Sequence, residues 1–199
     1  MTFSRDTFVE ASDTTLASHT ADDGGTWTKH PSFATAAQVI GAEDKVQGGS
    51  TTATSLYTHS GSPLSADYYV QSDVSWSSSL DALPGVAARV NVAANTAYRI
   101  DIDLSGAFRL IKVVAGVATV LATWGAATAG VTYRVRISVV GTAIKGYVDG
   151  VERLSVTDAS ITAAGKAGIA VRQNGRVDNF LAVDLPEGNP WYHARHQGL

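Results

Sequence analysis

The sequence predicts an all-β protein built as two antiparallel sheets packed face to face. In "YRVRISVV", residues 133–140, apolar side chains recur at every second position, which is the period of a strand with one buried face. Gly141-Thr142 and Asp149-Gly150 follow, and such pairs suit the tight turns of antiparallel hairpins. A chain with many strands and no convincing helical period must close into a barrel or stack two sheets. Polar residues on the outward positions favour stacked sheets.

The first 60 residues are less regular than the rest. Short strands are expected in "TWTKH", "AAQVI" and "TSLYTH", with "TADDGG" and "QGGSTTATS" as loops. From residue 66 onward the pattern becomes strand after strand. The expected strands are 66–76, 86–92, 98–104, 107–114, 117–124, a three-stranded meander over 133–157, and two more around Asn174-Gly175. The segment "DASITAAGKAG" is read as one short helical turn at most.

Several of these motifs together resemble a known superfamily. The opening "RDTFVEASDTTLASHTADDGGTWTKH" has the order Asp-x-Phe, Leu, His-Thr, Gly-Gly, Trp, and "YRVRISVVGTAIKGYVDGV", "GKAGIAV" and "VDNFLAV" follow. This set resembles the concanavalin A-like lectin/glucanase superfamily, in particular the laminin-G-like domains of phage particle proteins and bacterial extracellular proteins.

The resemblance implies an antiparallel jelly-roll sandwich whose curved sheet often holds sugars. It also implies that the first and last strands lie side by side, with Asp6 and Phe8 near Asp178 and Phe180. We expect one such domain over residues 1–185 and a C-terminal tail over 186–199. Fold analogy alone does not supply an activity.

The composition of the chain limits the classes of partner that we expect. The chain has 199 residues, no cysteine and a net charge of −3, so disulfides and thiol chemistry are absent and there is no basic field for nucleic acid. Neither a signal peptide nor an apolar stretch long enough to span a membrane is present in the sequence. We therefore expect no nucleic-acid or membrane partner, and a location in a virion or outside a cell that is reached without a signal peptide.

Catalysis has little support in the sequence. Glycosidases of the superfamily use a Glu-x-Asp-x-x-Glu strand, and none of the four glutamates (Glu10, Glu43, Glu152 and Glu187) has that spacing. Asp101 and Asp103 project from one face of a strand about 7 Å apart, which is close enough for an acid/base pair. A solvated strand face that also carries Arg99 is the favoured interpretation. The sequence also lacks a Gly-x-Ser-x-Gly elbow, so we predict that the chain is not an enzyme.

A cofactor is not required, with calcium as the one candidate. Laminin-G-like domains often carry a calcium ion, and Asp22 and Asp23 in "TADDGGT" offer oxygen ligands. A plain polar turn is the preferred alternative at this position.

Aromatic residues give the best binding hypothesis. Trp124, Tyr147 and Trp76 fall at strand ends or on outward positions, where a flat ring suits stacking on a sugar or on another protein. Because a sandwich core also needs large side chains, Trp27 and Trp76 are assigned preferentially to the core.

The tail "PEGNPWYHARHQGL" is not needed by a self-contained sandwich. Its prolines and glycines oppose a helix, and its adjacent aromatic residues are costly to expose. We expect Trp191, Tyr192 and His193 to form an interface with a neighbouring subunit or with the domain itself.

The leading functional hypothesis is a non-catalytic structural or adhesive protein of a phage virion, either a capsid decoration protein or a tail-associated component. It would act through contacts with other virion proteins and with further copies of itself as a homo-oligomer. The alternative is a carbohydrate-binding module for host-surface glycans, and a glycoside hydrolase ranks below both.

Overall fold

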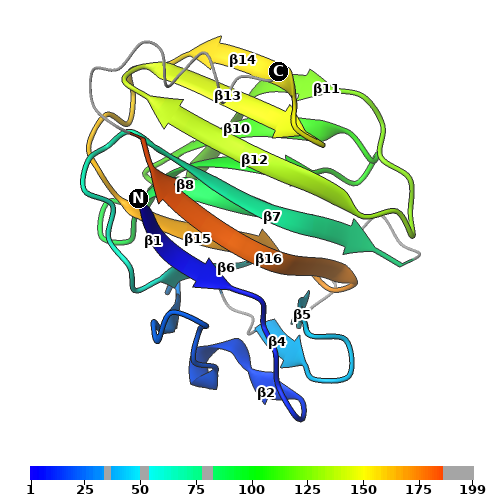
Figure 1. Ribbon diagram of the computed structural model, residues 1–199. Helices are drawn as coiled ribbons and strands as arrows, with labels where there is room; N and C mark the ends of the chain where they lie inside the picture. Colours follow the sequence, from blue (N-terminus) through cyan, green and yellow to red (C-terminus); the bar gives the residue numbers. More distant parts are fainter. Residues whose placement is uncertain (34–36, 50–53, 78–82, 186–199) are drawn as a thin grey trace.

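The structure is a computed structural model that describes residues 1–33, 37–49, 54–77 and 83–185 (Figure 1). Within these residues it contains two stacked antiparallel sheets of nine and seven strands. Every strand pair recorded for them runs antiparallel, from the β1–β16 pair to the β8–β9 pair. The prediction of an all-β, two-sheet antiparallel sandwich is confirmed.

The nine-stranded sheet faces the viewer in Figure 1 and has the order β14-β13-β12-β7-β16-β5-β4-β2, with β1 also paired to β16. Its strands are β1 (Thr2–Asp6), β2 (Thr14–Thr15), β4 (Ala37–Ile40), β5 (Lys45–Gly48), β7 (Tyr68–Trp76), β12 (Tyr133–Val140), β13 (Ala143–Val148), β14 (Val151–Thr157) and β16 (Gly175–Asp184).

The seven-stranded sheet lies behind it and has the order β11-β10-β9-β8-β15-β6-β3. Its strands are β3 (Trp27–Lys29), β6 (Ser55–His59), β8 (Gly85–Asn91), β9 (Thr96–Ile102), β10 (Phe108–Val114), β11 (Val117–Trp124) and β15 (Lys166–Val171).

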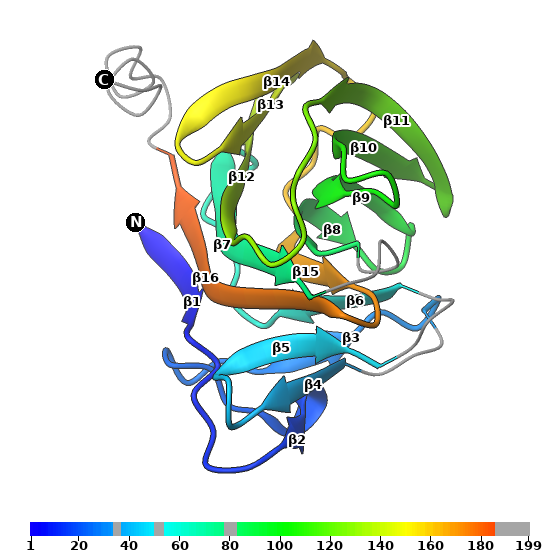
Figure 2. The same ribbon diagram turned by 90° about the vertical axis from the view of Figure 1, so that its right-hand side faces the viewer.

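The core lies between the two layers, which Figure 2 shows from the side. Val135, Ile137 and Val139 of β12 are fully buried, as their alternation predicts, and Ile100 of β9 packs into the same cluster from the opposite sheet. Burying such side chains is the main stabilising contribution of a sandwich core. The polar residues between them on β12 are therefore directed to the other side of the sheet.

The turn predictions are confirmed where positive φ was required. Gly141 has a φ of 52°, and Asp149 and Gly150 have φ values of 51° and 81°. Two successive positive φ values match the twist of the flanking strands in a two-residue hairpin. The helical turn considered for residues 158–168 is not formed, whereas a 3-10 helix, η1, spans Leu16–Ser18.

The opening motif forms a buried cluster around Asp6. The Asp6 carboxylate accepts hydrogen bonds from Trp27 Nε1 at 2.6 Å and from His19 Nε2 at 3.0 Å. The Phe8 ring packs against both of these rings, at centroid distances of 5.6 Å and 5.9 Å. The spaced residues of this motif thus specify packing between β1, η1 and β3.

The first and last strands lie side by side, as the resemblance implied. β1 pairs with β16, and Asp6 is opposite Phe180. The register of β16 shifts between Asp178 and Leu181, where Asn179 has a φ of 51°. A bulge of this kind bends a strand and changes the direction of its side chains.

Candidate functional site

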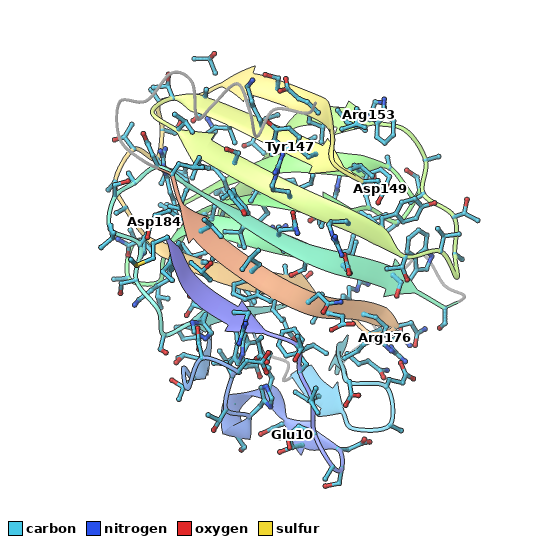
Figure 3. The ribbon with its side chains drawn as sticks, viewed as in Figure 1. Glu10, Tyr147, Asp149, Arg153, Arg176 and Asp184 are labelled. Carbon is cyan, nitrogen blue, oxygen red and sulfur yellow. The ribbon has the colours of Figure 1, made fainter. Side chains whose placement is uncertain are left out.

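Charged and aromatic side chains gather on the outer face of the nine-stranded sheet, which is the face directed away from the core. They come from the strands β13, β12, β7 and β16, which are consecutive in the order of that sheet. Figure 3 shows Tyr147 on this face and Asp149 at the turn that ends β13. The outer face is therefore the first place to look for a binding site.

One group on this face, which we call the Asp73 cluster, consists of Asp73, Arg134 and Asn179. Arg134 binds Asp73 in a two-pronged pair, with Nε at 2.7 Å from Oδ1 and Nη2 at 2.9 Å from Oδ2. Asn179 Nδ2 donates a third hydrogen bond to Asp73 Oδ2 at 3.0 Å. Paired forks of this kind hold both partners in a defined orientation.

Strand pairing explains why these residues meet. Asp73 is directly opposite Arg134 on β12 and directly opposite Asp178 on β16. The bulge at Asn179 directs the Asn179 side chain to the Asp73 carboxylate. Three strands that are distant in sequence thus contribute to one cluster.

Electrostatics in the cluster follow from these contacts. The hydrogen bond with Asp73 raises the pKa of the Arg134 guanidinium, which stays protonated. Burial, with repulsion from Asp73 and Asp44, raises the pKa of the Asp178 carboxyl. The group therefore presents a fixed cation among carboxylates, with both hydrogen-bond donors and acceptors.

An open hollow of about 480 Å³ adjoins the cluster. Asp73, Thr132, Arg134, Asp149 and Gly150 line it. Arg134 reaches its rim with 54% of its side chain exposed. Sites for small molecules combine a concavity of this size with a few fixed polar groups.

Arg136 forms a second group on the same face. Its guanidinium carbon lies 4.0 Å from the ring centroid of Tyr147 and 5.4 Å from that of Tyr69. Burial raises the pKa of Tyr147, and the neighbouring Glu152 adds to the effect against the opposing influence of Arg136. Glu152 also accepts a hydrogen bond from Lys145 at 3.0 Å. A stacked cation beside tyrosines forms a flat surface with polar edges.

The three aromatic candidates have different environments. Trp76 is 2% exposed in the core, so its ring is not available for stacking, in agreement with the preferred core assignment. Trp124 is partly buried against Phe108, and the Arg153 guanidinium carbon lies 4.5 Å from its ring centroid. Tyr147 faces outward as expected but is only 3% exposed, because Arg136 lies over its ring.

The structure corrects the prediction that Arg99, Asp101 and Asp103 lie on a solvated face. Asp101 is 1% exposed and binds Arg109 at 2.9 Å and Arg99 at 3.3 Å. Asp103 Oδ1 accepts hydrogen bonds from Ser105, and although burial opposes it these bonds lower the pKa of Asp103. Both carboxylates are thus committed to structural contacts on the seven-stranded sheet.

Asp22 and Asp23 have a structural role in the hairpin region. Asp23 Oδ2 accepts the Arg5 backbone N–H at 2.9 Å, and Asp22 Oδ2 accepts the Thr7 hydroxyl at 2.8 Å. In the described part of the chain, no group of three or more His, Asp or Glu side chains is arranged to hold a metal ion. The preferred alternative, a polar turn, matches these contacts.

Two further expectations concern the C-terminal tail and a membrane-spanning segment. The interface residues Trp191, Tyr192 and His193 lie outside the described residues. Among the residues that are described, no helix is long and apolar enough to cross a membrane.

Sequence reasoning placed Arg134 and Arg136 on an outward face but missed their partners. Asp73 and Tyr69 stand on outward positions of a strand that the alternation did predict, so a signal was present. Asn179 gave no signal, because its direction depends on the bulge in β16.

Comparison with known proteins gives a fold and no family. No protein-family model matches the chain, and no curated protein matches its sequence. Among solved structures, the carbohydrate binding module CBM66 from Bacillus subtilis is 20% identical, covers 77% of this chain and 91% of its own, and has a TM-score of 0.62.

Two other solved structures are similar at lower identity. The Ca²⁺-bound exoplasmic/lumenal domain of VIP36 is 8% identical over 88% of this chain and 90% of its own, with a TM-score of 0.60. A native glycosidic hydrolase is 11% identical over 92% of this chain and 99% of its own, with a TM-score of 0.56. These neighbours give no support to a phage context. They show that the chain has a concanavalin A-like β-sandwich fold.

Proposed function

We propose that this chain is a non-catalytic carbohydrate-binding module that holds a glycan on the outer face of its nine-stranded sheet. The observation that carries the proposal is the Asp73 cluster, in which a carboxylate, a guanidinium and an amide are fixed beside an open hollow. Sugars present adjacent hydroxyls that both donate and accept hydrogen bonds, and groups of these three kinds complement them.

The Arg136 group supports the same reading. Arg136 lies over the buried Tyr147 ring and beside Tyr69 on the same sheet face, so the surface offered to a sugar ring is formed by Arg136 and Tyr69. The similarity to CBM66, whose name describes a carbohydrate binding module, favours this function over the virion role. A place in a phage particle, self-association and a location outside a cell stay predictions from the sequence.

The absence of catalysis is also part of the proposal. Asp73 is held on both oxygens by Arg134, and Asp101 is enclosed by two arginines. Both carboxylates are therefore committed to contacts within the protein, whereas a general acid or base must be free to reach the substrate.

The proposal is tested first by a glycan array and then by calorimetric titration of the best ligand. Arg134→Ala and Asp73→Asn should each weaken binding about tenfold or more, because each change leaves a fixed partner without its hydrogen bonds. Unfolding free energies should change by less than about 1 kcal/mol, since the pair is partly exposed.

Arg153→Ala is the matched control, because it also removes one exposed arginine and uncovers Trp124. It should leave the affinity unchanged. Loss of binding in Arg153→Ala with retention in Arg134→Ala would move the site to the sandwich edge. Failure to bind any glycan on the array would refute the function, and polysaccharide turnover that disappears in Asp73→Asn would replace it with a hydrolase.

A further inference from the structure

A second hollow, of about 620 Å³, opens between the two sheets and is separate from the outer-face site. Three segments form its wall: residues 2–5 of β1, the turn 23–25 that precedes β3, and residues 59–61 at the end of β6. β1 belongs to the nine-stranded sheet, and β3 and β6 belong to the other (Figure 2). The residues that line the hollow therefore come from both layers. It shares no residue with the hollow beside Asp73.

Two buried polar groups in this wall lack a partner. Ser4 is fully buried and His59 is 1% exposed. Within the part of the chain that the structure describes, neither Ser4 Oγ nor His59 Nε2 has a hydrogen-bond partner. Buried polar atoms are normally satisfied, because leaving one unpaired costs free energy. Two such atoms in the wall of one hollow point to a molecule that satisfies them.

His59 offers a donor at this position. Its Nδ1 accepts the Gly61 backbone N–H at 3.0 Å, which assigns the ring proton to Nε2. Burial lowers the pKa of His59 against the attraction of Asp23, so the ring is neutral near neutral pH. Nε2 lies 3.2 Å from Asp23 Oδ1, a weak electrostatic contact that does not satisfy the buried N–H as a well-formed hydrogen bond would. A ligand hydroxyl beside both atoms would accept this proton and donate its own to Asp23.

Glycines bring the turns directly onto the unsatisfied groups. A Cβ at Gly25 would lie 2.3 Å from His59 Cε1, and a Cβ at Gly61 would lie 2.3 Å from Ser4 Oγ. Neither glycine has a positive φ, so space and not backbone conformation requires them. Gly24 has no atom within 4 Å of its own Cβ position, so this side of the turn is open.

The charges in the wall decide the ligand class. The ionised groups of the wall are Arg5 and Asp23, one of each sign, and their side chains are 60% and 29% exposed. A balanced wall favours neither an anion nor a cation. The other polar side chains of the wall are the hydroxyls of Thr2, Ser4 and Ser60 and the His59 imidazole. With the Asp23 acceptor they complement the hydroxyl groups of a ligand.

We propose that this hollow binds a neutral polyhydroxylated ligand, such as one monosaccharide unit or a comparable polyol. Ser4 Oγ and His59 Nε2 hydrogen-bond to its hydroxyls, and Asp23 Oδ1 accepts a hydrogen bond from an adjacent one. Both atoms are closed off from solvent, so entry of the ligand includes a small shift of the turn 23–25. The site does not depend on the outer-face function, because the two sites share no residue.

The test is NMR of the full chain with labelled histidines, titrated with glycerol, D-glucose, D-galactose and D-fructose. At least one of these should shift the His59 ring signals in a saturable way, with a dissociation constant in the millimolar range. The buried ring of His30, whose Nδ1 accepts the Ser32 N–H, is the internal control and should not shift. Ser4→Ala should weaken the effect about fivefold, since it removes one hydrogen bond.

Asp23→Asn provides a second variant if Ser4→Ala does not fold, because it changes a partly exposed acceptor. Arg134→Ala should weaken glycan binding on the outer face about tenfold or more and leave the His59 response intact, which separates failure of this site from failure of the proposed function. The site is overturned by a His59 signal that none of the neutral probes shifts, by a response to acetate or phosphate alone, or by an Nε2 proton that exchanges only with a bound water molecule.

Discussion

The two sheets carry similar ion pairs on their outer faces, but in opposite environments. On the nine-stranded sheet, Asp73 and Arg134 have 15% and 54% of their side chains exposed beside a hollow. On the seven-stranded sheet, Asp101 and Arg109 have 2% and 21% exposed. A second cluster of buried apolar residues accompanies the latter pair on that sheet. It consists of Leu56, Ala87, Val90, Ala97 and Ala170, with Phe33 packed against it. The same alternating pattern therefore marks a candidate binding face in one sheet and a covered face in the other.

The largest expected difference between the two faces is in the loss of unfolding free energy when the carboxylate of each pair is removed. Asp101→Ala leaves Arg99 and Arg109 facing a site without a counter-charge, and breaking a buried pair in this way costs about 3 kcal/mol or more. Asp73→Ala breaks an exposed pair and should cost less than about 1 kcal/mol. Urea unfolding at equilibrium measures both values. Equal costs would mean that the two faces do not differ in burial as described.

A third charged group, around His19, extends the comparison to pH. His19 Nδ1 lies 2.6 Å from Glu10 Oε1, and Nε2 lies 3.0 Å from Asp6 Oδ2, so both ring nitrogens face carboxylates. Only the doubly protonated ring can donate to both. Burial opposes the charge, but the hydrogen bonds and charges of Asp6 and Glu10 outweigh it and raise the pKa of His19.

Because the folded pKa is raised, the stabilisation should be complete below the ordinary value of 6.5 and should be lost as the pH rises through the folded pKa. His19→Gln should therefore destabilise the protein by about 1 kcal/mol more at mildly acidic pH than at alkaline pH. Urea unfolding of both proteins at the two pH values gives the difference. Burial lowers the pKa of His30 and His59, which makes the folded state less stable at acidic pH. This contribution is the same in the wild type and in His19→Gln, so it cancels in the difference. A difference that grows with pH would contradict the assignment.

The sequence predicted the strands after residue 66 because their inward positions are apolar. Alternation did not predict β1, whose inward residues Ser4 and Asp6 are polar and which only the resemblance implied. It also missed β5, which has the single apolar residue Val46. These strands are held by hydrogen bonds and by pairing with β16, which alternation does not reveal.

The candidate site was predictable only in part for a similar reason. Arg134 could be placed on an outward face from β12 alone. Its meeting with Asp73 depends on the register between β12 and β7, and the approach of Asn179 depends on a bulge. Both are products of long-range pairing, whereas periodicity reports only the local strand.

The most direct test of the account is to map a bound glycan onto the backbone by NMR chemical-shift changes. The account predicts that the changes concentrate on β7, β12 and β13 and the bulge of β16, that they disappear in Arg134→Ala, and that β9 and β10 are unaffected. Changes that centre on β9 and β10, or a map that is identical in the wild type and in Arg134→Ala, would contradict it.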